Sequence, residues 1–210
     1  MKVTVKLCGF NKLEDINFAI NAGIDYIGLN NIAISKRFVT ADEIITLLEK
    51  LSLENRLKIV VLLNYFNFDF LVKLKELGVK FIQSYLANDE DKELFSMGFK
   101  LIKVFSIASK EDIIEVKNFD FTNYSYCLLD TKIEGSMGGT GQTFNWQLYS
   151  ELDLSLTIKM ILAGGLNAEN VRQALSETKA SFIDLAGGVE EKTGQKSYAL
   201  IKELIEQLKG

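Results

Sequence analysis

Residues 157–190, TIKMILAGGLNAENVRQALSETKASFIDLAGGVE, contain the pattern that decides the fold. A short apolar run leads into Gly164-Gly165, a segment with helical spacing follows, and a second apolar run leads into Gly187-Gly188. A helix that connects two successive strands makes them parallel neighbours in one sheet. This stretch therefore predicts two strand–helix units of a parallel sheet.

The same alternation continues outward to both ends of the chain. Short β-branched or aromatic runs predict strands, and the segments between them carry apolar residues at helical spacing. One helix should begin after Thr40, because Glu43 stands three residues further on, as in a capping box. A closing helix is expected over residues 198–208. The predicted strands are residues 3–8, 25–30, 57–63, 79–84, 100–106, 124–129, 157–163 and 181–185.

Eight such units fill the chain from residue 1 to residue 210. Each unit has about 26 residues, which leaves no room for a second domain. The sequence therefore predicts a single α/β domain over 1–210, a (β/α)8 TIM barrel. An open, doubly wound parallel sheet is the structural alternative, because periodicity alone does not show that the sheet closes.

Composition excludes several classes of function. The formal net charge of −4 gives little attraction for nucleic acid or an anionic membrane surface. No apolar run reaches the roughly 18–20 residues of a membrane span, and the first residues do not resemble a signal peptide. Two cysteines exclude a disulfide framework, which favours the reducing cytoplasm. Nothing in the sequence decides between a monomer and a homodimer.

The chain contains no histidine and no proline. An A/T-rich coding sequence or a deliberately restricted amino-acid alphabet would each produce this bias. Without imidazole, acid–base chemistry has to come from carboxylates, thiols, tyrosines or lysines. A zinc site is not expected, since such sites draw mainly on cysteine and histidine.

Chemistry-bearing residues follow the predicted strands where a barrel has its active site, at the carboxyl ends of the strands. Cys8 ends the first strand and Asp130 ends the sixth. Strands six, seven and eight open into glycine-rich loops, which suit tight turns but also let main-chain amides approach an anion. We expect these loops to bind phosphate, through Gly139, Thr140, Gly141, Gly164, Gly165, Gly187 and Gly188.

A series of motifs then points to a known family. In order, they are KLCG at 6–9, SKRFV at 35–39, LD at 129–130, GGTGQTFNW at 138–146, LAGGL at 162–166, ENV at 169–171, Asp184 and GVE at 188–190. Over its whole length the chain resembles the phosphoribosylanthranilate isomerases of tryptophan biosynthesis, which are (β/α)8 barrels. The first motif and the GGTGQTFNW loop are highly specific in combination, whereas LAGGL also suits other phosphate-binding barrels.

The resemblance implies an Amadori rearrangement that needs no metal or organic cofactor. The substrate is the phosphosugar N-(5-phosphoribosyl)anthranilate, an aminoaldose, and the product is the aminoketose 1-(2-carboxyphenylamino)-1-deoxyribulose 5-phosphate. By resemblance, the aspartate at Asp130 is the general acid that opens the furanose ring. The cysteine at Cys8 is the general base that removes the C2′ proton.

These roles set conditions on their surroundings. A free thiol has a pKa of about 8.5, and Lys6, two residues earlier on the same strand face, is expected to lower it. Asp184 should pair with Lys6 if the barrel closes. Asp130 has to be protonated part of the time to act as an acid, which needs burial or a neighbouring anion.

The remaining substrate contacts come from the loops after strands two and four. Arg37 offers a planar fork for the anthranilate carboxylate. By resemblance, Gln83 and Tyr85 contact the substrate, although Tyr85 stands where the family usually has histidine. Lys36 replaces the usual proline before Arg37, and the two serines common before GVE are missing.

Two other functions remain open at this point. One is another phosphoribosyl-binding barrel isomerase, such as the aminoaldose isomerase of histidine biosynthesis, which would carry aspartate where this chain has Cys8. The other is a folded but non-catalytic barrel of restricted composition that binds phosphate without turnover.

Overall fold

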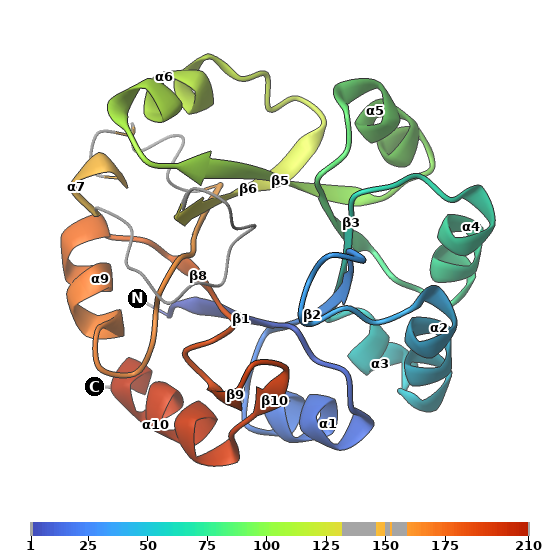
Figure 1. Ribbon diagram of the computed structural model, residues 1–210, viewed down its shortest axis with the longest axis horizontal. Helices are drawn as coiled ribbons and strands as arrows, with labels where there is room; N and C mark the ends of the chain where they lie inside the picture. Colours follow the sequence, from blue (N-terminus) through green and yellow to red (C-terminus); the bar gives the residue numbers. More distant parts are fainter. Residues whose placement is uncertain (1, 132–145, 150–151, 153–158, 210) are drawn as a thin grey trace.

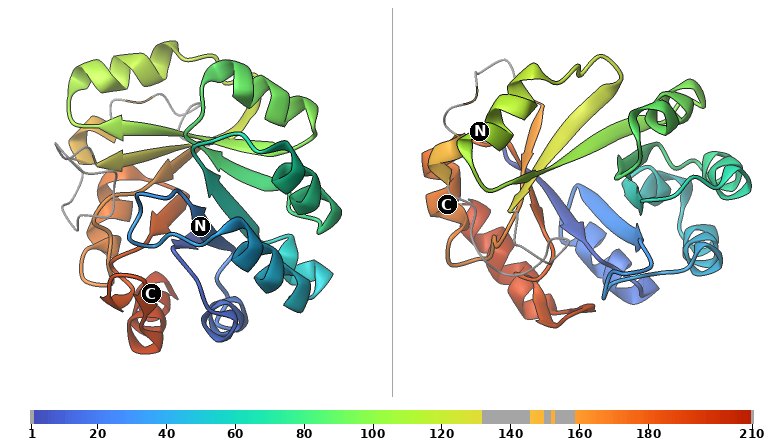
Figure 2. Two further views of the ribbon diagram at one scale, coloured as in Figure 1. Left: turned by 45° about the vertical axis from the view of Figure 1, so that its right-hand side comes forward. Right: turned by 45° about the horizontal axis from the view of Figure 1, so that its top comes forward.

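Eight parallel strands form a closed barrel in the computed structural model, in the order β1 to β8 and with helices around the outside (Figures 1 and 2). The structure describes residues 2–131, 146–149, 152 and 159–209. The sheet closes between its first and last strands, where Lys6 is paired in register with Asp184. The predicted (β/α)8 barrel is confirmed, and the open sheet is excluded.

Strand bounds follow the predicted apolar runs within a few residues. The sixth strand continues through Thr131, so Asp130 is the next-to-last residue of this strand and not its last. The strands are β1 (Thr4–Cys8), β2 (Tyr26–Asn31), β3 (Ile59–Leu63), β4 (Phe81–Ser84), β5 (Lys100–Ile107), β6 (Tyr124–Thr131), β7 (Met160–Leu162) and β8 (Phe182–Leu185).

Helices occupy the connections between strands. The predicted capping box is confirmed, because the Glu43 amide donates to the Thr40 hydroxyl and the Thr40 amide donates to the Glu43 carboxylate. The helices are α1 (Leu13–Asn21), α2 (Ala41–Lys50), α3 (Leu53–Arg56), α4 (Phe68–Glu76), α5 (Asn88–Ser96), α6 (Lys110–Asn118), α7 (Trp146–Tyr149), α9 (Val171–Thr178) and α10 (Tyr198–Lys209). Among these described helices, none is long and apolar enough to cross a membrane.

A layer of aromatic side chains fills the amino-terminal half of the barrel interior. Tyr26 packs edge-on against Phe81 at 5.3 Å and stacks on Phe182 at 5.6 Å between ring centroids. All three residues stand at the first positions of their strands. Because this end of the interior is filled by apolar packing, polar side chains inside the barrel gather at the opposite, carboxyl end.

A small hairpin after β8 was not among the elements predicted from the sequence. It consists of β9 (Glu190–Lys192) and β10 (Gln195–Lys196), which pair antiparallel. Figure 1 shows it between α1 and α10, next to the carboxyl end of β1. Strands of three and two residues are too short to produce a readable alternation, so no pattern in the sequence marks them.

Candidate active site

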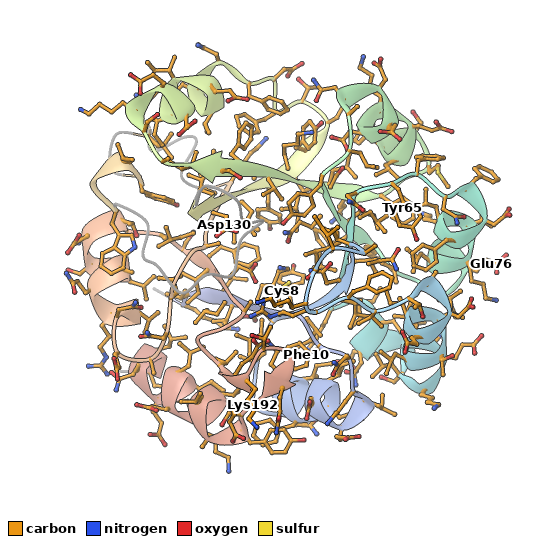
Figure 3. All side chains as sticks on the ribbon, in the orientation of Figure 1. Cys8, Phe10, Tyr65, Glu76, Asp130 and Lys192 are labelled. Atoms are coloured by element: carbon orange, nitrogen blue, oxygen red, sulfur yellow. The ribbon has the colours of Figure 1, made fainter. Side chains whose placement is uncertain are left out.

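A cavity of about 280 Å³ opens at the carboxyl ends of the strands. Cys8 reaches it from β1 and Asp130 reaches it from β6, on different parts of the barrel wall. Figure 3 shows both residues inside the ring of helices, whereas Glu76 lies at its outer edge. The thiol and the carboxyl group, 122 positions apart in sequence, therefore face one space.

Most of the predicted site residues line this cavity. Lys6 does not, since its side chain is fully buried directly beneath, on the strand that carries Cys8. Gly139, Thr140 and Gly141 lie outside the described residues. The predicted residues that line the cavity are Cys8, Arg37, Gln83, Tyr85, Asp130, Gly164, Gly165, Asp184, Gly187 and Gly188.

The predicted pair of Lys6 and Asp184 is confirmed. The Lys6 ammonium donates to Asp184 Oδ2 at 2.9 Å, and the two side chains are 0% and 10% exposed. Burial alone would lower the pKa of Lys6, but the negative charges of Asp184 and of the Cys8 thiolate raise it above its usual value. Lys6 therefore stays cationic beside the thiol.

The pKa of Cys8 is a correction to the sequence analysis. Burial of the thiol raises its pKa, and the negative charge of Asp184 adds to the rise. Lys6 acts in the predicted direction, together with Lys196 and Arg37, but these cations do not reverse the rise. Burial penalises the thiolate because a protein interior solvates an anion less well than water does. The neighbouring cations limit the rise without reversing it.

Gln83, near the end of β4, and Tyr85, directly after this strand, form a neutral polar pair. Gln83 Nε2 donates to the Tyr85 hydroxyl at 3.1 Å. Burial raises the pKa of Tyr85 far above its usual value, and the negative charges of Asp130 and Cys8 raise it further. Tyr85 is therefore a neutral hydrogen-bonding group at all physiological pH values.

Two buried acceptors in the cavity wall have no hydrogen-bond donor in the described part of the chain. They are Gln83 Oε1 and Asp184 Oδ1. Leaving a buried acceptor unpaired costs about 1–3 kcal/mol, and a ligand that donates hydrogen bonds removes that cost. The wall is therefore chemically suited to a ligand with hydroxyl groups.

The glycine pairs after β7 and β8 lie against each other. Gly164 and Gly165 have φ of +93° and +63°, in the left-handed region that favours glycine. A Cβ on Gly188 would come within 2.0 Å of the Leu166 carbonyl oxygen, so only glycine permits the close approach of the two loops. The two loops therefore lie side by side and line the same cavity.

Comparison with known proteins decides the family. The model of the N-(5′-phosphoribosyl)anthranilate isomerase family matches residues 5–207, nearly the whole chain. The chain belongs to the N-(5′-phosphoribosyl)anthranilate isomerase family. The family, the isomerase class and the link to tryptophan biosynthesis expected from the sequence are confirmed.

Individual members of the isomerase family are similar to this chain over nearly their whole length. The isomerase of Aquifex aeolicus is 36% identical over 209 residues, which cover 99% of this chain and 98% of that protein. The isomerase of Bacillus cereus is 33% identical, with 96% of both chains covered. A solved isomerase structure from Thermotoga maritima is 26% identical with a TM-score of 0.79, and 99% of both chains are covered.

Three residues close to the cavity of this isomerase were not predicted as site residues from the sequence. Gly28 on β2 stands beside Cys8, and a Cβ there would lie 2.7 Å from its Sγ. Glu190 and Lys196, from the unpredicted hairpin, form buried ion pairs next to the cavity. Glu190 belonged to the GVE motif, so the motif marked its position but not its contacts.

Proposed function

We propose that this isomerase converts N-(5-phosphoribosyl)anthranilate into 1-(2-carboxyphenylamino)-1-deoxyribulose 5-phosphate, with Cys8 as general base and Asp130 as general acid. The observation that carries the proposal is that both side chains line one cavity, which the glycine pairs after β7 and β8 also line. A thiol and a carboxyl group are then available to one sugar whose phosphate lies at the main-chain amides.

The proposed reaction begins with ring opening. Asp130 donates a proton to the ring oxygen O4′ as the C1′–O4′ bond breaks, and the nitrogen lone pair forms the C1′=N bond of a Schiff base. Cys8 then removes the C2′ proton, which gives an enolamine. Tautomerisation forms the C2′ ketone, and the proton lost from C2′ is balanced by one gained at C1′.

The surroundings of Cys8 fit a base that works on a cationic Schiff base. Its thiolate is disfavoured by burial but is accompanied by the cationic Lys6. A thiolate whose pKa is raised is a stronger base, so a raised pKa suits removal of a weakly acidic carbon-bound proton. Asp184 holds the Lys6 ammonium in place through the 2.9 Å hydrogen bond.

The other predicted residues bind different parts of the substrate. Arg37 takes the anthranilate carboxylate, and Gln83, Tyr85 and Asp184 take the sugar hydroxyls, which fits the two unpaired buried acceptors of the wall. The phosphate belongs at the glycine loops after β6, β7 and β8, which include Gly139, Thr140, Gly141, Gly164, Gly165, Gly187 and Gly188. Two free cysteines and a biosynthetic role fit an enzyme of the cytoplasm.

The decisive test is turnover of N-(5-phosphoribosyl)anthranilate by the purified protein, followed by the loss of its fluorescence. We expect conversion to the aminoketose, and growth rescue of a tryptophan auxotroph that lacks this isomerase. Binding of the substrate without turnover would instead indicate the non-catalytic barrel.

Replacing Gln83 by leucine should raise KM about tenfold with little change in kcat. The change removes the buried acceptor Oε1 and the donor to Tyr85, and a neutral hydrogen bond contributes up to about 1.5 kcal/mol, which corresponds to roughly tenfold in affinity. Steady-state kinetics of the variant measures both constants. Gln173→Leu on the exposed face of α9 is the matched control, and an unchanged KM for Gln83→Leu would remove Gln83 from the sugar site.

Replacing Gly28 by alanine should lower kcat about 10- to 100-fold. The new Cβ would lie 2.7 Å from Cys8 Sγ, too close for van der Waals contact, so the thiol has to move. Displacement of a reacting group by about 1 Å can cost as much as 100-fold in rate. The control is the same change in Cys8→Ala, where it should have no further effect on kcat because the displaced thiol is absent.

A further inference from the structure

Arg37 is held by a buried carboxylate from the hairpin after β8. Arg37 Nε donates to Glu190 Oε1 at 2.9 Å and Nη2 donates to Oε2 at 2.7 Å, so the guanidinium is bound side-on by both oxygens. The Arg37 and Glu190 side chains are 12% and 3% exposed. Paired hydrogen bonds of this kind fix the plane of the guanidinium as well as its position.

A second buried cation completes the arrangement. Lys196 Nζ donates to Glu190 Oε1 at 2.7 Å and to the Cys8 carbonyl oxygen at 2.6 Å, and its side chain is 1% exposed. The pKa of Glu190 lies below its usual value, because the two cations outweigh the effect of burial. One carboxylate thus ties the loop after β2 to the end of β1.

The aliphatic part of the Arg37 side chain packs against Gly9. A Cβ at Gly9 would lie 2.3 Å from Arg37 Cδ, so the arginine occupies the space that any larger residue would need. With Nε and Nη2 engaged by Glu190, Nη1 makes no hydrogen bond to the described residues. Arg37 also lines the cavity, so its unused edge is available to a ligand there.

We propose that Glu190, supported by Lys196, is the positioning residue that presents the Nη1 edge of Arg37 to the aromatic carboxylate of the substrate. Glu190 itself lies behind Arg37 and acts only through it. The charges of Arg37, Lys196 and Glu190 sum to +1, so the group attracts a carboxylate. Each of the two buried cations is paired with Glu190. This inference rests on the proposed function, because it assumes a substrate with a carboxylate on its ring.

The test compares two substrates that differ only in this carboxylate. One is N-(5-phosphoribosyl)anthranilate and the other is the corresponding aniline compound, each prepared from ribose 5-phosphate and the amine. Glu190→Gln keeps the size of the side chain, removes its charge, and replaces one accepting oxygen by an amide nitrogen, which cannot accept the second hydrogen bond from Arg37. We expect KM for the anthranilate substrate to rise about 10- to 100-fold and KM for the aniline substrate to stay within about threefold.

The control is Glu191→Gln, the exposed neighbour on the same hairpin, which should leave both KM values unchanged. If Glu190→Gln does not fold, Glu190→Asp retracts the carboxylate by one methylene group and should show the same selectivity between substrates. An equal rise in both KM values would reduce Glu190 to a structural role and overturn the inference, as would no rise in either. Absence of turnover of both substrates by the unaltered protein would instead overturn the proposed function, and with it the ligand assigned to Arg37.

Discussion

Cys8→Ala should lower kcat by about 10²–10⁴-fold, the usual contribution of one general base. The substitution removes the only thiol that lines the described cavity and leaves the proposed phosphate and carboxylate contacts of the substrate unchanged. KM should therefore change much less than kcat. Steady-state kinetics with N-(5-phosphoribosyl)anthranilate measures the two constants separately.

Cys127→Ala is the matched control for this prediction. Cys127 is fully buried, and its Sγ lies 2.6 Å from Met160 Sδ, on the outer side of the barrel wall among core residues. Its replacement should lower the melting temperature through a cavity in the core but leave kcat unchanged. Full turnover by Cys8→Ala, or equal loss of kcat in both variants, would contradict the role of Cys8.

The dependence of activity on pH adds a second readout for the same residue. Because burial raises the pKa of Cys8, only a small fraction is thiolate at neutral pH. In the proposed mechanism Cys8 is deprotonated and Asp130 is protonated, so kcat/KM should fall as the pH rises above the pKa of the thiol, where neither group holds the proton that ring opening needs. This fall at the pKa of the thiol should be absent from the residual activity of Cys8→Ala.

Asp130→Asn should lower kcat by about 10²–10⁴-fold for a different reason. Asparagine keeps the size of the side chain but has no acidic proton to donate to the ring oxygen, so ring opening becomes the slow step. Deuterium at C2′ of the substrate identifies that step. We expect a primary isotope effect on kcat in Cys8→Ser, where proton removal is impaired, and an isotope effect near 1 in Asp130→Asn.

Asp120→Asn is the control for the acid, since Asp120 is an exposed carboxylate that caps the turn before β6. It should leave kcat unchanged. A full primary isotope effect in Asp130→Asn would mean that ring opening is not the impaired step, and the acid would have to be another group.

Local patterns in the sequence predicted most of the fold. Apolar runs, helical spacing and the Thr40 capping box depend on residues close in the chain, so they can be read without coordinates. The helix α3 and the β9–β10 hairpin were missed because elements of two to four residues have no period to detect. Closure of the barrel followed only from the count of units and needed the pairing of β1 with β8 to confirm it.

The sequence predicts those features of the candidate site that depend on where a residue stands along its strand. It does not predict those that depend on the groups around the residue. Cys8 and Asp130 stand at strand ends, and the fold alone brings them to one cavity. The pKa of Cys8 depends instead on how deeply the barrel buries the thiol, and this effect outweighs Lys6. Glu190 and Lys196 gain their contacts from a hairpin that folds back over β1, which no spacing in the sequence reveals.

The most direct measurement is a crystal structure of the protein with the product 1-(2-carboxyphenylamino)-1-deoxyribulose 5-phosphate. We expect Cys8 Sγ within about 4 Å of C2′, the Asp130 carboxyl group within about 3.2 Å of O4′, and the phosphate at the amides of Gly164, Gly165, Gly187 and Gly188. A product whose C2′ lies out of reach of the Cys8 thiol, or whose O4′ faces away from Asp130, would contradict the account.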